Sequence, residues 1–133
     1  DKLPQFKRHY SGEKSLGIIF NCPVFPTRSI IKKYTEFLEL KQLNDDAHDW
    51  KEDLERGHIT HANIGVFRYM RRGGTDIDSY YWNTNMLGII ARYRMHIERL
   101  GDFEYLKKDI AKMYRILLTL ERERDYFLKM YKS

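Results

Sequence analysis

Histidines and acidic residues are concentrated between residues 48 and 61, and such side chains are the ones that hold metal ions. The cluster consists of His48, Asp49, Glu52, His58 and His61. Imidazole and carboxylate groups are ordinary ligands of zinc and other transition metals. However, Gly57 separates the two halves of the cluster, and neither an HExxH nor a CxxC pattern occurs in the sequence. We therefore expect no metal ion here, and we interpret the cluster as surface histidines beside a solvated acidic helix.

Residue patterns for nucleophilic or acid–base catalysis are missing from the sequence. The single cysteine, Cys22, lies between Asn21 and Pro23, an apolar context in which a thiol is usually buried and inert. No serine has the glycine-flanked pattern of a nucleophile elbow, and no carboxylate pair stands in an apolar context that would separate two pKa values. We expect a protein that is not an enzyme and has no cofactor. The least favoured alternative is a small enzyme whose catalytic site is assembled only in the folded structure.

The stretch YMRRGGTD, residues 69–76, combines arginines and glycines as phosphate-binding loops do. A Walker-type loop would follow a strand and lead through Gly-Lys-Ser/Thr into a helix, and the sequence has neither feature here. Gly73 and Gly74 instead follow the last apolar residue of a predicted helix. Helices often end at this position with a residue in the left-handed conformation, which glycine adopts easily. Arg71 and Arg72 fall in the last turn, where cations complement the helix dipole. The pattern indicates a helix end whose arginines can still contact phosphate as part of a surface.

The strongest functional pattern is a series of cations near the C-terminus, which we call the basic stripe. It consists of Lys108, Lys112, Arg115, Arg122 and Lys129, with Thr119 in register. Steps of four, three and seven residues place these side chains on one face of a helix, over about 30 Å at 1.5 Å per residue. Such a row can follow a phosphate backbone. An ordinary solvated face and a contact with an acidic protein groove are the alternatives.

A second group of polar and small residues shares one face of the preceding predicted helix. It consists of Asn85, Gly88, Arg92, His96 and Arg99. Glycine at position 88 would allow a backbone to approach closely. We therefore add Arg92 and Arg99 to the candidate phosphate contacts.

Composition and charge agree with a binding protein. The chain has 133 residues, 42% of them hydrophobic, and a net charge of +5. Apart from an acidic block at residues 45–57 the chain is basic, which favours nucleic acid or acidic partners. No apolar run is long enough to span a membrane. The single cysteine leaves no internal disulfide and favours a reducing intracellular compartment, with an organelle also compatible.

The elements that must position these side chains are predicted to be helices after an extended segment. Residues 1–26 contain all three prolines, and SLGIIF (15–20) has the composition of a short strand. A helix is predicted to begin near Thr27 or Ser29 and to end near residues 43–46. A short helix around Trp50 and Leu54 should end at Gly57, and another should begin at Thr60.

Two long helices are predicted for the C-terminal half. The first runs from about residue 77 to residue 100, and the second begins at Asp102, as its N-cap, and continues to about Tyr131. The second carries an apolar seam with a break at Arg124. The seam consists of Leu106, Ile110, Met113, Leu117, Leu120, Phe127 and Tyr131. Because only LGD joins the two helices, we expect them to form an antiparallel hairpin.

These patterns predict a mainly α single domain over residues 1–133. It comprises an extended arm (1–26), short helices (27–74) and a two-helix hairpin (75–133). We expect a non-enzymatic basic subunit of a larger assembly, such as a ribonucleoprotein or ribosome-like component, that contacts RNA phosphates and neighbouring protein subunits. The alternative is a helical adaptor that binds only protein. The predicted RNA contacts are Arg71, Arg72, Arg92, Arg99, Lys108, Lys112, Arg115, Arg122 and Lys129.

Overall fold

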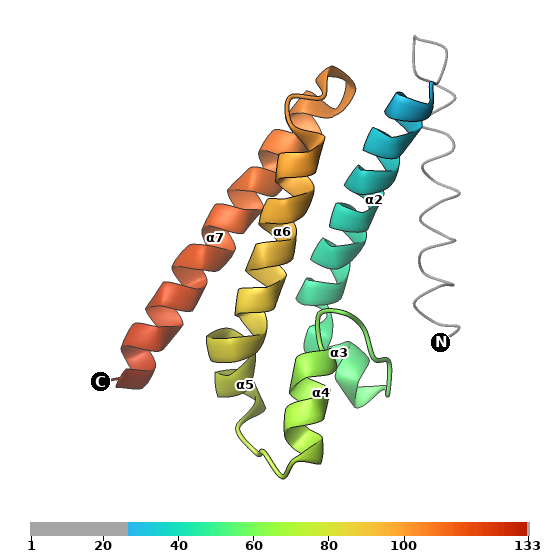
Figure 1. Cartoon of the computed structure of the whole chain (residues 1–133). Coiled ribbons are helices and arrows are strands. Elements are labelled where there is room, and N and C mark those ends of the chain that lie inside the picture. The colour runs from blue at the N-terminus through green and yellow to red at the C-terminus, as the bar shows by residue number, and fades with distance from the viewer. Residues whose placement is uncertain (1–26, 133) are drawn as a thin grey trace.

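The computed structural model of the protein describes residues 27–132, which form helices joined by short turns (Figure 1). The helices are α2 (Arg28–His48), α3 (Trp50–Glu55), α4 (Ile64–Arg71), α5 (Ile77–Tyr80), α6 (Met86–Leu100) and α7 (Lys107–Lys132). A π-helical segment, Tyr81–Asn85, connects α5 to α6, and a 3-10 turn, Glu104–Leu106, precedes α7. The mainly α class is confirmed. The predicted arm 1–26, its strand at 15–20 and Cys22 lie outside the described residues.

Helix α6 is the central element of the fold. It packs against α2 on one side and against α7 on the other, whereas α2 and α7 have little contact with each other. Both flanking helices run antiparallel to α6 (Figure 1), which confirms the predicted C-terminal hairpin. At the other end, α3 packs on α2, and α4 packs on α5 and the π-helical segment. None of the described helices combines the length and apolarity needed to cross a bilayer.

Helix α2 is longer than the sequence pattern indicated. It begins as predicted, because the Thr27 Oγ1 accepts a hydrogen bond from the Ile30 N–H at 3.3 Å. The predicted end near residues 43–46 is wrong, and so is the expectation of only short helices across 27–74. The helix continues because Leu43, Asp46 and Ala47 are all buried, and because Gln42 Nε2 donates to Asp46 Oδ1 at 3.0 Å. A buried face therefore extends through the acidic residues.

The stretch 69–76 is a turn between helices, as predicted. Gly73, just past α4, has φ of 91°, a left-handed conformation that glycine adopts without steric cost. Asp76 then caps α5, since its Oδ1 accepts a hydrogen bond from the Ser79 N–H at 3.1 Å. The predicted stops at Gly57 and Gly101 also have positive φ, 76° and 59°.

Two predicted helix starts are displaced. Helix α4 begins at Ile64, four residues after Thr60, which opens a turn instead. Asp102 does not cap the last helix, because a 3-10 turn comes first and its N-cap residue is Phe103. No side chain forms a capping hydrogen bond with this turn. The Phe103 ring packs edge-on against Tyr34, with centroids 5.4 Å apart. The chain therefore turns to bury an aromatic side chain before α7 can begin.

The predicted seam of α7 is buried over its first half. Leu106, Ile110, Met113 and Leu117 belong to the core, together with side chains from α2 and α6. Further along, Leu120 and Phe127 are only partly buried, and the side chain of Tyr131 is 56% exposed. On α4 the buried residue is Val66, whereas Met70 is 44% exposed.

Arg124, which interrupts the seam, contacts the π-helical segment. Its Nε donates to the carbonyl of Trp82 and its Nη2 to the carbonyl of Asn83, both at 3.0 Å. A π-helical turn changes the hydrogen-bonding pattern of the backbone around it. The arginine thus supplies charged donors to two carbonyls of the segment that joins α5 to α6, which explains why an apolar side chain is replaced at this position.

Candidate nucleic-acid interface

All five cations of the basic stripe lie on the exposed surface of α7. Among the described residues, none of the five forms an ion pair, although Glu104 and Asp125 lie four and three residues from Lys108 and Arg122. Arg122 instead donates to Thr119 Oγ1 at 3.3 Å, and Thr119 Oγ1 donates to the carbonyl of Arg115 at 3.0 Å. The charges of the stripe are therefore available to a ligand.

The stripe borders two cavities, because α2 and α7 stand apart on either side of α6. The first has a volume of about 560 Å³ and lies between the end of α2, the π-helical segment and α7. Its lining includes Lys112, Arg115 and Thr119 from the stripe. The second, of about 420 Å³, is lined by Trp82, Thr119, Arg122, Glu123, Tyr126 and Phe127. Three stripe cations thus share cavity walls with aromatic side chains.

The far wall of the larger cavity is aromatic and held in place by packing and hydrogen bonds. Trp50 stacks on Tyr81, with ring centroids 4.0 Å apart and an interplanar angle of 7°. The Tyr81 hydroxyl donates to the carbonyl of Ala47 at 3.1 Å, and the Tyr93 hydroxyl donates to Asn44 Oδ1. These rings are therefore fixed before any ligand arrives.

Both phenols of this wall stay neutral at physiological pH. Burial, reinforced by the neighbouring Tyr93 and Glu123, raises the pKa of Tyr81 well above its usual value. Burial and the nearby Asp45 carboxylate raise the pKa of Tyr93 in the same way. The cavity consequently combines an uncharged aromatic wall with a rim that carries Lys112, Arg115 and the carboxylate of Glu123.

Tyr126 is a member of this surface that the sequence pattern did not identify. It occupies the position between Arg122 and Lys129 in the same series of three- and four-residue steps, and its side chain is 67% exposed. The seven-residue step between Arg122 and Lys129 in the predicted stripe indicates that one more residue of the same face lies between them. Exposed aromatic side chains among cations are typical of surfaces that bind single-stranded nucleic acid.

The remaining predicted contacts are exposed but do not join the stripe. Arg71 and Arg72 lie at the end of α4, and Arg71 Cζ is 5.8 Å from the centroid of the Phe67 ring. Arg92 lines a separate cavity between α2 and α6, and Arg99 lines a hollow on α2. The nine predicted residues therefore do not form one continuous surface.

The second predicted polar face, on α6, has a mainly structural role. His96 is buried and contacts Glu36 of α2. Asn85 Nδ2 donates to the carbonyl of Ala62 at 2.5 Å. No described residue approaches Gly88, whereas a Cβ at Gly65 would lie 2.3 Å from Asn85 Oδ1. Within the described residues, no backbone makes the close approach expected at Gly88, and the tight contact at Gly65 is with the side chain of Asn85.

The histidines of the cluster 48–61 are dispersed over different surroundings. His48 lines the larger aromatic cavity, His61 lines the cavity between α2 and α6, and His58 Nδ1 lies 3.8 Å from Asp53 Oδ1. Among the described residues, three side chains that could together hold one metal ion are found elsewhere in the fold, outside this cluster. The expectation of no metal at 48–61 stays a prediction.

Comparisons of the chain with protein-family models, with curated proteins and with solved structures find no match.

Proposed function

We propose that the protein is a non-enzymatic subunit of a larger assembly and that it holds single-stranded RNA along α7. The observation that carries this proposal is the shared surface of cations and aromatic rings. Arg115 and Lys112 line the same cavity as Trp50 and Trp82, and Arg122 lines the next cavity with Tyr126. Proteins that bind single strands combine a cationic track for the backbone with aromatic rings for the bases.

The spacing along α7 agrees with an extended strand. The stripe covers 22 residues from Lys108 to Lys129, roughly 30 Å of helix at 1.5 Å per residue. Lys112, Arg115 and Arg122 would bind phosphates, and arginine can do so through two parallel hydrogen bonds. Tyr126 would stack on a base exposed between two phosphates. Sequence preference is expected to be weak, because stacking accepts any base.

Reversing two charges of the stripe should weaken RNA binding and make it less sensitive to salt. Each phosphate contact contributes about 0.7–0.9 to the slope of log Kobs against log salt. Lys112→Glu with Arg115→Glu should therefore flatten this slope by about 1.4–1.8. Fluorescence anisotropy with a labelled oligouridylate at several salt concentrations measures it. The fold should be preserved, because both side chains are exposed.

The matched control is Arg28→Glu with Lys32→Glu. This pair changes the net charge equally, but both residues line a hollow at the start of α2 that contains no residue of α7. Binding and slope should stay close to those of the unmodified protein. If the control pair reduces both as much as the stripe pair does, binding follows net charge alone and the proposed track on α7 is wrong.

Removing Tyr126 should weaken binding without changing the salt dependence. Stacking contributes about 1–3 kcal/mol per base, so Tyr126→Ala should raise the Kd of the same oligouridylate by at least about fivefold. The slope against salt should stay the same, since no charge is lost. Tyr105→Ala, on the 3-10 turn before α7 and 38% exposed, is the control and should have little effect. A Tyr126→Ala variant that binds normally would remove stacking from the proposal.

An adaptor that binds only protein is the second candidate, and exposed apolar side chains on α7 support it. Tyr114 and Leu118 lie four residues apart, on one side of the helix, and are 48% and 40% exposed. Recovery of partners from native lysate with and without nuclease separates the two functions. Partners that stay bound after nuclease treatment, together with no binding of oligouridylate at low salt, would favour the adaptor.

A further inference from the structure

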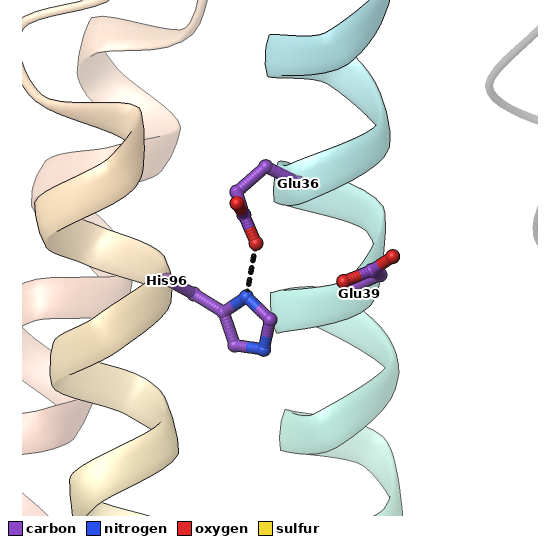
Figure 2. A group of neighbouring side chains, drawn as sticks. All are labelled: Glu36, Glu39 and His96. Atoms are coloured by element: carbon purple, nitrogen blue, oxygen red, sulfur yellow. Dashed lines mark hydrogen bonds and ion pairs between the residues drawn. The ribbon is translucent and has the colours of Figure 1, made fainter.

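We propose that Glu36, Glu39 and His96 form a binding site for a zinc ion that links α2 to α6. Figure 2 shows the two glutamates on α2 and the histidine on α6, with Glu36 and His96 meeting between the helices and Glu39 lying along α2. One carboxylate oxygen from each glutamate and one ring nitrogen lie within 4.8 Å of one another. A three-residue spacing places the two glutamates on the same side of α2.

The histidine is buried and only one of its ring nitrogens has a partner. Its side chain is 5% exposed, and Nδ1 contacts Glu36 Oε2. Among the residues that the structure describes, none forms a hydrogen bond with Nε2. The buried ring is thus already oriented toward Glu36, and an ion held by all three residues would replace the contact between Nδ1 and Glu36 Oε2.

The cluster brings two carboxylates of one helix together. Glu39 has no ion pair or hydrogen bond through its side chain within residues 27–132, and it is exposed. Glu36 is shared between His96 and Arg99, whose Nη1 is 3.7 Å from Glu36 Oε1. Two carboxylates three residues apart on one helix repel each other. A divalent ion between them would neutralise both and bind the neutral imidazole.

The donor types and the neighbouring space fit zinc. Zinc binds imidazole nitrogen at about 2.0–2.1 Å and carboxylate oxygen at about 2.0–2.2 Å, and sites with three protein ligands complete their coordination with water. Small rotations of the two glutamate side chains would bring their oxygens to these distances. A cavity of about 390 Å³, lined by Glu39 and His96 among others, adjoins the cluster and has room for the water ligand.

Zinc titration of the full chain, after removal of metals with a chelator, tests the site. Calorimetry should show one zinc ion bound per chain, and the melting temperature should rise because the ion joins two helices. Glu39→Gln should weaken zinc binding at least about tenfold. Its fold should be unaffected, because the side chain is exposed and has no described partner. His96→Gln should abolish the rise in melting temperature.

Two controls make the outcome specific to this cluster. Glu98→Gln removes an exposed carboxylate from the same helix as His96, and it should leave zinc affinity unchanged. His58→Ala removes an imidazole from the cluster 48–61, and it should also bind zinc normally. The proposal is overturned if zinc produces neither binding heat nor stabilisation, if Glu39→Gln binds as tightly as the unmodified chain, or if His58→Ala is the variant that loses binding.

Discussion

Leu117→Ala should lower the free energy of unfolding by about 2–5 kcal/mol, the usual range for a buried leucine. Leu117 is 1% exposed and belongs to the core that α7 shares with α6 and α2. The substitution removes buried apolar surface and leaves a cavity that the surrounding helices can fill only in part. Chemical denaturation followed by circular dichroism measures the change.

The next residue on the helix provides the matched control. Leu118 is 40% exposed, so Leu118→Ala should cost less than about 1 kcal/mol, because little apolar surface is buried there. The two variants have the same chemistry, and their helix propensities change equally. A loss below roughly 1 kcal/mol for Leu117→Ala would contradict the packing of α7 on α6. It would mean that the seam faces solvent in the isolated chain and serves as an interface instead.

Asn63→Ala should also destabilise the protein strongly, by roughly 2–4 kcal/mol. The side chain is completely buried and forms three hydrogen bonds. Its Oδ1 accepts from the Thr60 N–H at 2.8 Å, and its Nδ2 donates to the carbonyls of Trp50 and His58 at 3.3 and 2.9 Å. Alanine would leave these backbone groups without a partner, and each buried group left unsatisfied costs about 1–3 kcal/mol.

The consequence should extend beyond the turn itself, because Asn63 holds α3 against the start of α4. Trp50, whose carbonyl it binds, stacks on Tyr81 in the wall of the aromatic cavity. Denaturant titration gives the loss of stability, and Trp50 fluorescence should report a loosened wall. Asn83→Ala is the control, since its side chain is exposed and forms no hydrogen bond with a described residue, and it should stay within about 0.5 kcal/mol. Equal effects of both variants would show that the amide network is unimportant.

The helices and most of their ends could be predicted from the sequence because the causes are local. Thr27 caps the first described helix with its own hydroxyl, and Gly73 ends α4 through its own backbone conformation. The buried half of the α7 seam follows from the period of one helix. Each of these features depends on residues within about one turn of each other, which is the range over which sequence spacing specifies geometry.

Departures from the predicted elements arise where a distant contact outweighs the local pattern. The acidic end of α2 stays helical because Leu43 and Ala47 are buried against other elements. The start of α7 is delayed because Phe103 packs on Tyr34, which lies far away in the sequence. Arg124 breaks the apolar seam, yet it contacts carbonyls more than 40 residues earlier in the chain. Helix propensity is a weak preference that tertiary packing overrides.

The sequence by itself determined a basic, mainly helical chain with a long C-terminal hairpin and a row of cations along its last helix. Only the tertiary structure decided what surrounds those cations. Because α2 and α7 pack on opposite sides of α6, aromatic cavities open beside Arg115 and Arg122. The same packing brings His96 to Glu36, 60 residues away in the sequence. The spacing of side chains along a helix shows which residues are neighbours on that helix. The aromatic cavities and the contact between His96 and Glu36 depend instead on how separate helices pack together, and the sequence period of a single helix does not specify that packing.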